Sequence, residues 1–370
     1  TFGEIFAWII GWILILEYGV SVAAVANGWS GYFNNALTAI GLGLPDFLTK
    51  GPVAGGLVNL PAMIIILLLM LMLIVGIKQS ARLNAGMVFI KVLTIIIFIT
   101  VSIFNINPIN WSPFMPFGWF DTTPEGNTVG ILAGASLVFF AYVGFDAVST
   151  AVEEARDPQK DVPKGIIASL LFCTIIYILV SALLTGIVPY KELNVSSPVA
   201  HALQIIGYNW ASALVATGVI AGLTTVMLVL YYGLTRIIVA ISRDGLIPSM
   251  FSHVNEKTQT PITTTVVCGV IMAVAAGFMP LGILAELVNI GTLAAFMMVC
   301  AGVIFLRYTQ PNMKRPYKMP AGYLLATLGT LSCLALILFL PSVTHLRFLL
   351  WVMVGIIIYF LYSYRHSKLS

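Results

Sequence analysis

The stretch FFAYVGFDAVSTAVEE, residues 139–154, lies in a hydrophobic segment and carries Gly144 and the acidic Asp146 near its middle. A charged side chain is costly in hydrocarbon, and a glycine weakens a helix. Together the two residues predict that a helix running through this segment is interrupted. The alternative interpretation is a continuous helix that packs closely against a neighbour at a small residue.

The composition around this stretch indicates the class of protein. Of the 370 residues, 59% are hydrophobic and 9% are charged, against about 25% charged in a typical soluble domain. Apolar runs recur along the whole chain, and in lipid such runs must be helices because every backbone polar group needs an internal partner. The sequence therefore predicts an all-α, polytopic membrane protein. Its ten candidate spans are Phe2–Ala26, Leu57–Gly76, Ala85–Phe104, Thr128–Val152, Pro163–Val188, Trp210–Ser242, Thr263–Pro280, Leu284–Leu306, Ala321–Leu340 and Phe348–Tyr364.

The basic residues predict the orientation of these spans. With the N-terminal end of the chain inside and ten alternating crossings, fourteen of the 18 Lys and Arg residues fall in inner loops or the C-terminal tail. Only Lys50, Lys191 and Arg347 fall in outer loops, and Lys91 lies within a span. This positive-inside bias predicts that both ends of the chain are cytoplasmic and that the protein lies in the cell membrane. The net charge of +4 therefore reflects topology and indicates no nucleic-acid partner.

The sequence contains none of the patterns that would indicate an enzyme. The four cysteines lie in apolar spans without metal-ligand spacing, and they are typical of small buried hydrophobic residues. A glycine-rich phosphate loop, a zinc-binding histidine pair and a nucleophile elbow are all missing. We expect no metal and no cofactor.

Ionisable residues inside spans are rare and are functional by default. Here they are Glu17, Lys91 and Asp146, with Glu286 near the outer end of its span. The structural alternative is that these residues pair with one another or reach a membrane surface, as Lys91 could do by extending its ammonium.

An interrupted helix also exposes backbone groups at mid-membrane. Such groups are tolerated only where they line a cavity or are buried in protein. In transporters these breaks bind substrates, because amide groups at a half-helix terminus hold a carboxylate and freed carbonyls hold cations. The stretch at 139–154 therefore predicts a substrate site.

Several motifs together resemble the amino acid–polyamine–organocation transporters, in particular their bacterial cationic amino acid branch. FFAYVGFDAVSTAVEE is similar to the discontinuous sixth helix of that family, and ARDPQKDVPKGI to the loop that follows it. SRDGLIP at 242–248, NIGTLAAF at 289–296 and KRPYKMP at 314–320 resemble later family motifs in the same order. The resemblance covers essentially the whole chain.

This resemblance implies a fold of two inverted five-helix repeats followed by two more helices. The ten spans would correspond to family helices 3–12, which leaves the first two helices outside this sequence. Residues 1–105 would be the remainder of the first repeat, 128–306 the second repeat and 321–364 the two accessory helices of a single transporter domain.

The resemblance also implies roles for individual residues. Phe140 would close over the substrate, and the backbone of Ala141, Val143 and Gly144 would bind its amino end. The acids Asp146 and Glu17 would favour cationic side chains, because a buried cation needs a nearby carboxylate. Thr292 would face the same cavity.

Lys91 resembles the lysine that takes the place of a sodium ion in proton-coupled members of the family. Burial of an ammonium lowers the free-energy cost of releasing its proton. We therefore expect proton-coupled uptake of cationic or broad-range amino acids by alternating access, with the amino acid and the lipid bilayer as partners. A non-transporting membrane partner or inactive fragment, a passive channel and, last, a membrane enzyme remain alternatives.

Overall fold

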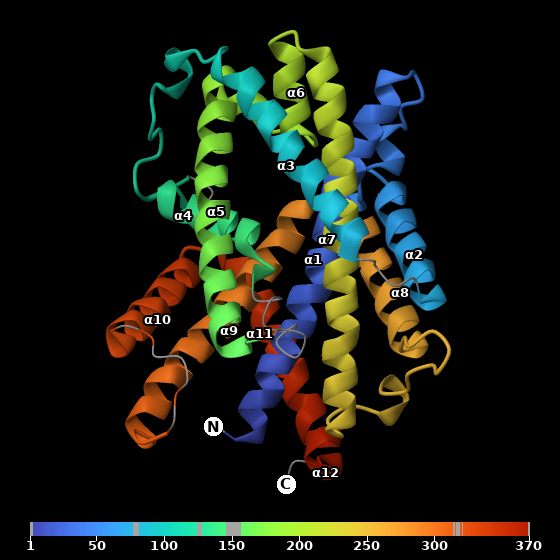
Figure 1. The fold of residues 1–370 in the computed structure, drawn as a ribbon, viewed down its shortest axis with the longest axis vertical. Helices are drawn as coiled ribbons and strands as arrows, with labels where there is room; N and C mark the ends of the chain where they lie inside the picture. Colours follow the sequence, from blue (N-terminus) through green and yellow to red (C-terminus); the bar gives the residue numbers. More distant parts are fainter. Residues whose placement is uncertain are drawn as a thin grey trace.

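A computed structural model describes residues 3–76, 81–123, 128–145, 157–313, 315, 319 and 321–368, with the side chains of 81–85 excluded. Nearly all of its regular structure is helical (Figure 1). In chain order the α-helices are α1 (Glu4–Ala39), α2 (Leu60–Val75), α3 (Ala81–Ile103), α4 (Ile131–Val138), α5 (Pro158–Ile187), α6 (Pro198–Ile205), α7 (Asn209–Arg243), α8 (Ile262–Phe278), α9 (Leu281–Thr309), α10 (Gly322–Leu338), α11 (Ser342–Ile358) and α12 (Tyr364–His366).

Short elements join these helices. Two strands, β1 and β2, pair antiparallel with Asp121 opposite Val129, and the last helix continues through a π-helical turn, η8. The short elements are η1 (Asp46–Leu48), η2 (Pro52–Ala54), η3 (Pro108–Trp111), β1 (Asp121–Thr122), β2 (Thr128–Val129), η4 (Phe139–Tyr142), η6 (Tyr190–Leu193), η7 (Ser249–Phe251) and η8 (Tyr359–Ser363).

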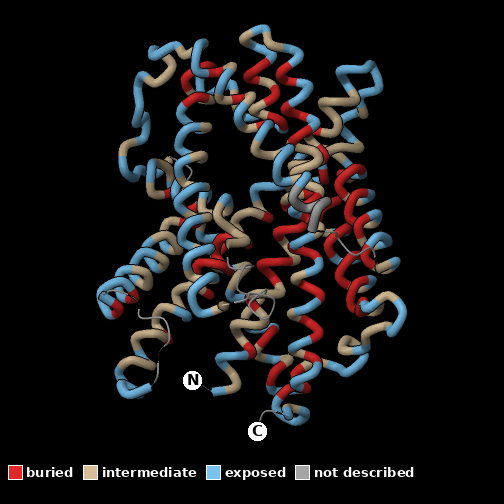
Figure 2. The backbone as a smooth tube through the Cα atoms, in the orientation of Figure 1, coloured by how far each residue is buried: buried red, intermediate tan, exposed pale blue. Residues whose placement is uncertain are grey.

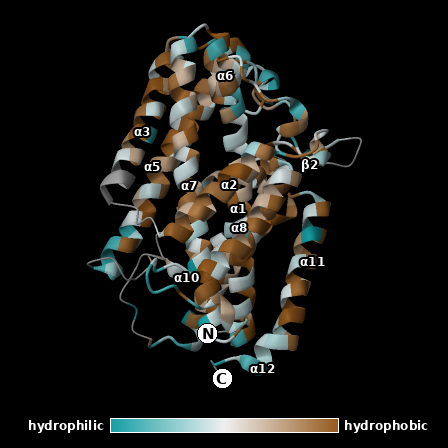
Figure 3. Ribbon diagram, turned by 90° about the vertical axis from the view of Figure 1, so that its right-hand side faces the viewer, coloured by the Kyte–Doolittle hydropathy of each residue, from teal (hydrophilic) through white to brown (hydrophobic). Residues whose placement is uncertain are grey.

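Six of the described helical segments are long and apolar enough to cross a membrane. They are Glu4–Ala39, Gly86–Ile103, Pro158–Ile187, Asn209–Arg243, Leu281–Thr309 and Ser342–His366. Four shorter apolar segments overlap the remaining predicted spans: Leu60–Val75, Ile131–Tyr142, Ile262–Phe278 and Gly322–Leu338. Apolar residues cover the middle of the helices, and hydrophilic residues gather mostly toward the two ends of the molecule (Figure 3). The predicted class, a polytopic helical membrane protein, is confirmed, whereas the number of ten crossings stays a prediction.

The centre of the molecule is the packing of α1 against α7. An added Cβ at Gly11 would meet Ile241 at 3.0 Å, and one at Gly19 would meet Leu234 at 3.6 Å. Contacts that move up one helix while they move down the other show that the two helices run antiparallel. Small residues let helix backbones approach closely where hydrophobic burial supplies no driving force between helices.

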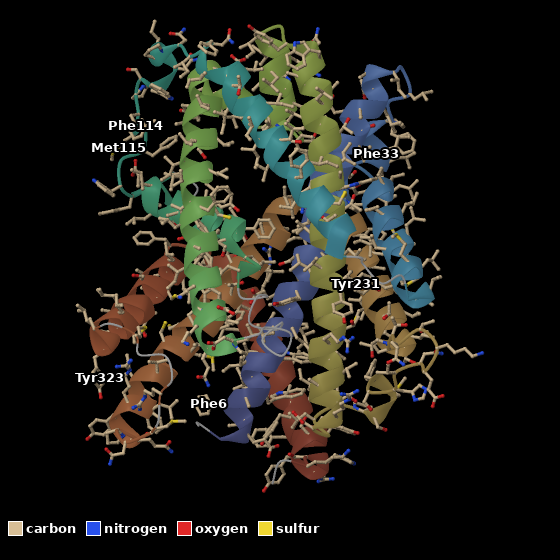
Figure 4. The ribbon with its side chains drawn as sticks, viewed as in Figure 1. Phe6, Phe33, Phe114, Met115, Tyr231 and Tyr323 are labelled. Carbon is tan, nitrogen blue, oxygen red and sulfur yellow. The ribbon has the colours of Figure 1, made fainter. Side chains whose placement is uncertain are left out.

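The main core lies on this pair and on its neighbours α2 and α8. Buried residues of all four helices form one hydrophobic cluster, and Figure 2 shows buried segments concentrated along them. Tyr231 of α7 is fully buried at this core, and its hydroxyl donates to the carbonyl of Thr265 at 2.5 Å (Figure 4).

Helix α1 is longer than the sequence indicated. The predicted span ended at Ala26, whereas the helix continues to Ala39. The extension is rich in polar residues, which a hydropathy reading assigns to a loop, but three of its side chains donate hydrogen bonds to other elements. The bonds run from Trp29 Nε1 to Thr224 Oγ1 (3.0 Å), from Ser30 Oγ to Asn59 Oδ1 (2.6 Å) and from Asn35 Nδ2 to Ser197 Oγ (2.5 Å).

The two ends of the chain lie at the same end of the molecule (Figure 1). Stacked indoles connect α1 to α11, with 4.5 Å between the ring centroids of Trp12 and Trp351. Each of these two indoles donates to the backbone carbonyl of the other residue, at 2.9 and 3.2 Å.

Glu286, one of the span acids, forms a structural pair. Its carboxylate accepts a hydrogen bond from Thr344 at 2.5 Å and lies 3.5 Å from the guanidinium of Arg347. Both partners belong to α11, so the acid connects α9 to the last long helix. Among the described residues, Glu286 thus pairs with Thr344 and Arg347, which are not among the ionisable residues singled out in the spans.

Candidate functional site

The helix that begins at Ile131 does not continue through the quoted stretch. Regular α-helix ends at Val138, and a 3-10 turn follows over Phe139–Tyr142. Val143 is extended, with ψ 132°, and Gly144 has φ +106°. That φ lies in the region where an L side chain is strained and glycine is not. The predicted interruption of the span Thr128–Val152 is confirmed up to residue 145.

Asp146 lies outside the described residues, as do the others up to residue 156. Of the proposed substrate residues, the structure therefore places Phe140, Ala141, Val143 and Gly144 on the interruption itself.

Two carbonyls of the interrupted segment, residues 137–145, accept hydrogen bonds from other helices. The side-chain amide of Asn289 on α9 donates to the carbonyl of Leu137 at 2.9 Å. The hydroxyl of Tyr177 on α5 donates to the carbonyl of Ala141 at 2.7 Å. A carbonyl that leaves a helix inside a membrane needs such a partner, because lipid supplies none.

Aromatic rings enclose the same segment. Phe296 of α9 contacts Phe139 edge-on at 6.2 Å between centroids and lies 5.1 Å from Phe145. Phe140 packs against the main core of α1, α2, α7 and α8, whereas Phe139 packs against the cluster of α9 and α10 that contains Ile290. The interrupted segment therefore lies between two packed layers, and Phe140 connects it to the main core.

Glu17 and Thr292 are both buried, with exposed fractions of 0%. Glu17 belongs to α1 and Thr292 to α9. These helices pack together, and an added Cβ at Gly291 would lie 3.6 Å from Ile13 and 3.7 Å from Leu16. The hydroxyl of Thr292 donates to the carbonyl of Val288 in its own helix at 3.0 Å. Its proton is therefore used locally, and its oxygen keeps a free lone pair.

Lys91 lies at a different interface, between α3 and α7. Its aliphatic chain crosses Gly222, where an added Cβ would lie 3.4 Å from Lys91 Cγ and 3.5 Å from Cε. One turn away, Thr94 fits against Gly218 in the same manner. Lys91 is half-buried and takes part in none of the ion pairs found among the described residues.

Tyr177, Asn289 and Phe296 contact the interrupted segment but were not among the site residues predicted from the sequence. Asn289 and Phe296 stand at the two ends of the motif NIGTLAAF, with Thr292 between them. Their spacing of three and four residues places all three on one face of α9. That periodicity was a signal for Asn289 and Phe296, whereas nothing local distinguishes Tyr177 from other tyrosines.

In the part of the chain that the structure describes, no group of three or more His, Cys, Asp and Glu side chains could hold a metal ion. The interrupted segment brings together backbone carbonyls and aromatic rings, whereas the roles of Glu17 and Thr292 beside it stay predictions.

Comparison with known proteins shows the family of the chain. Residues 1–362 match the amino acid permease family. The chain belongs to the amino acid permease family. It is 48% identical over 375 residues to the branched-chain amino acid permease BcaP of Bacillus subtilis, with all of this chain and 79% of that protein covered.

Two further relatives are named for other substrates. The methylthioribose transporter of Bacillus subtilis is 45% identical over 372 residues, with all of this chain and 79% of that protein covered. The vacuolar cationic amino acid transporter 4 of Arabidopsis thaliana is 37% identical over 313 residues, with 84% of this chain and 51% of that protein covered. This amino acid permease is therefore a membrane transporter and not an enzyme.

Proposed function

We propose that this permease takes up amino acids across the cell membrane in symport with protons, by alternating access, and that it accepts branched-chain as well as cationic side chains. The observation that carries the proposal is the interrupted segment, residues 137–145, two of whose carbonyls accept hydrogen bonds from Asn289 and Tyr177. Every amino acid shares the ammonium and carboxylate that such a backbone can bind. A backbone site therefore predicts a range of substrates with different side chains.

The side chains around the interruption support a broad range. The rings of Phe139, Phe140, Phe145 and Phe296 provide apolar surface for a branched side chain. The buried acid Glu17, together with Asp146, would offset the charge of arginine or lysine. The relatives include a branched-chain amino acid permease and a cationic amino acid transporter.

Lys91 is proposed to couple transport to protons. Its stem is held against Gly222 of α7, so its ammonium has a restricted range of positions. Release and uptake of a proton there would change the charge at the α3–α7 interface, and such a change can bias one conformation over another.

We also propose the topology that the sequence predicts. Ten crossings with both ends of the chain cytoplasmic would place residues 1–105 and 128–306 in two inverted repeats, with 321–364 as accessory helices. The exposed residues Lys50 and Lys191 would then face outward, where an impermeant amine reagent applied to sealed cells should label them.

The decisive experiment measures uptake of radiolabelled leucine and arginine into proteoliposomes, with and without an inward proton gradient. We expect the gradient to drive accumulation of both. Lys91→Ala should abolish the effect of the gradient, and Lys191→Ala, which removes an exposed loop lysine, should leave it intact. Glu17→Gln and Asp146→Asn should reduce arginine uptake more than leucine uptake.

The other outcomes identify the alternatives. Flux that does not saturate and ignores the gradient would indicate a passive channel. No uptake of either amino acid would contradict the proposal and favour a non-transporting membrane partner.

A further inference from the structure

Two side chains from other helices, Asn289 and Tyr177, donate hydrogen bonds to carbonyls of the interrupted segment, and we call this pair the clamp. Leu137 lies just before the end of the α-helix, and Ala141 lies within the 3-10 turn that follows. One bond comes from Asn289 on α9 and the other from Tyr177 on α5. Because the donors belong to different helices, they fix the direction of the segment at two points four residues apart.

Asn289 is a fully buried amide that has a hydrogen-bond partner at only one of its two ends in the described part of the chain. Its exposed fraction is 0%, and its Oδ1 accepts no hydrogen bond within the described part of the chain. A buried amide with one unused end is unfavourable compared with an apolar residue of the same shape. The residue is therefore costly to keep, and its single bond goes to a carbonyl at the end of α4.

Tyr177 also does more than fill space. Its ring packs edge-on against Tyr142 at 5.3 Å between centroids, while the Tyr142 hydroxyl pairs with Thr174 at 3.1 Å. Two tyrosines therefore connect α5 to the turn, and only the Tyr177 hydroxyl reaches the main chain. Removal of that hydroxyl leaves the ring contact in place.

We propose that Asn289 and Tyr177 are positioning residues that hold the interrupted segment in its substrate-binding conformation. Without the two donors, the carbonyl of Leu137 would keep only the backbone bond that it accepts at the end of α4, and the carbonyl of Ala141 would lose its side-chain partner. Nothing from α5 or α9 would then hold these two carbonyls, and the segment could change direction. The donors keep these carbonyls occupied from outside, so that the backbone of Phe140–Gly144 is arranged before substrate arrives. Such preorganisation lowers the free-energy cost of binding. This inference rests on the proposed function of the segment.

The test compares Tyr177→Phe and Asn289→Leu with Tyr231→Phe in the full chain. Tyr231 provides a matched control, because its hydroxyl also donates to a main-chain carbonyl of another helix, Thr265 on α8, but at the main core. For each variant, KM and maximal rate are measured for leucine, alanine and arginine uptake. Hydrogen–deuterium exchange is followed over residues 137–145.

We expect KM to rise about fivefold in Tyr177→Phe, the effect of one lost hydrogen bond. The factor should be similar for all three substrates, because they share the groups that the backbone binds, and the maximal rate should change less than KM. Exchange within 137–145 should change in Tyr177→Phe and Asn289→Leu. In Tyr231→Phe, KM and exchange at 137–145 should stay at their original values while Tm falls.

Unchanged KM and unchanged exchange in both clamp variants would overturn the inference, as would equal changes in Tyr231→Phe. If the unaltered chain transports nothing, the proposed function fails, and the exchange measurement alone decides whether the two residues hold the segment. If Asn289→Leu does not fold, the Tyr177→Phe comparison decides.

Discussion

The α1–α7 pair and the interrupted segment at 137–145 differ in where their backbone carbonyls find hydrogen-bond donors. In α1 and α7 the backbone bonds stay within each helix, so the helices need only fit each other through small residues such as Gly19 and Gly233. In the interrupted segment the carbonyls of Leu137 and Ala141 receive side-chain donors from α9 and α5. A regular helix is thus sensitive to volume, whereas an interrupted one is sensitive to donors and to backbone conformation.

The largest effect should come from added volume at the α1–α7 interface. An added Cβ at Gly233 would lie 2.8 Å from the ring of Tyr18, which is itself 2% exposed. Gly233→Val should therefore destabilise the protein by about 1–3 kcal/mol, the usual cost of overpacking, and should lower Tm in detergent. Gly19→Ala is the matched control, because its new methyl would lie 3.6 Å from Leu234 in ordinary contact. An equal loss of stability in both variants would show that shape does not govern this interface.

A smaller loss of stability, with a distinct loss of function, is expected at the interruption. Gly144 has φ +106°, and no heavy atom of the described residues lies within 4 Å of an added Cβ, so Gly144→Ala tests conformation. The backbone strain is about 1–2 kcal/mol, which we expect to appear as an increase of about tenfold in KM. Gly134→Ala in α4 has equally open surroundings without the positive φ. Alanine favours helix there, so this control should keep its KM, and the comparison fails if the two variants behave alike.

The smallest effect should come from the polar contacts on the outer half of α1. Asn59 accepts from Ser30 at 2.6 Å and donates to Asn27 at 2.9 Å. Hydrogen bonds between helices in membranes contribute about 0.6 kcal/mol each, so Ser30→Ala should lower the free energy of unfolding by roughly that amount without changing KM. Denaturant titration of the purified protein measures the difference. A shift in KM would contradict the separation of packing from binding that the two regions display.

Part of the site was readable from the sequence. Gly144 beside an acid in an apolar run predicted the interruption, because glycine permits a left-handed φ and helix breaks in membranes are confined to sites. Thr292 was placed near the site by its motif. The partners of the freed carbonyls were not predicted, since Tyr177 and Asn289 are 36 and 152 residues away from the positions they contact.

The length of α1 is a second feature that the sequence predicted only in part. Hydropathy ended the span at Ala26, because the next thirteen residues contain Asn, Ser and Thr side chains. Ser30 and Asn35 donate to Asn59 and Ser197, at the N-terminal ends of α2 and α6. Trp29 donates to Thr224 of α7, and the helix continues to Ala39. A hydropathy window cannot register a partner that is distant in the chain.

The sequence by itself determined the helical membrane class, the position of the interruption and the identity of the ionisable residues in the apolar segments. These follow from local physical chemistry, because lipid forces backbone groups to pair within a segment and makes charged side chains in a span costly and therefore rare. Only the tertiary structure decided which side chains complete the interrupted segment and where Lys91 rests on α7. Those choices depend on which helices approach one another, and that is determined by packing between residues far apart in the sequence.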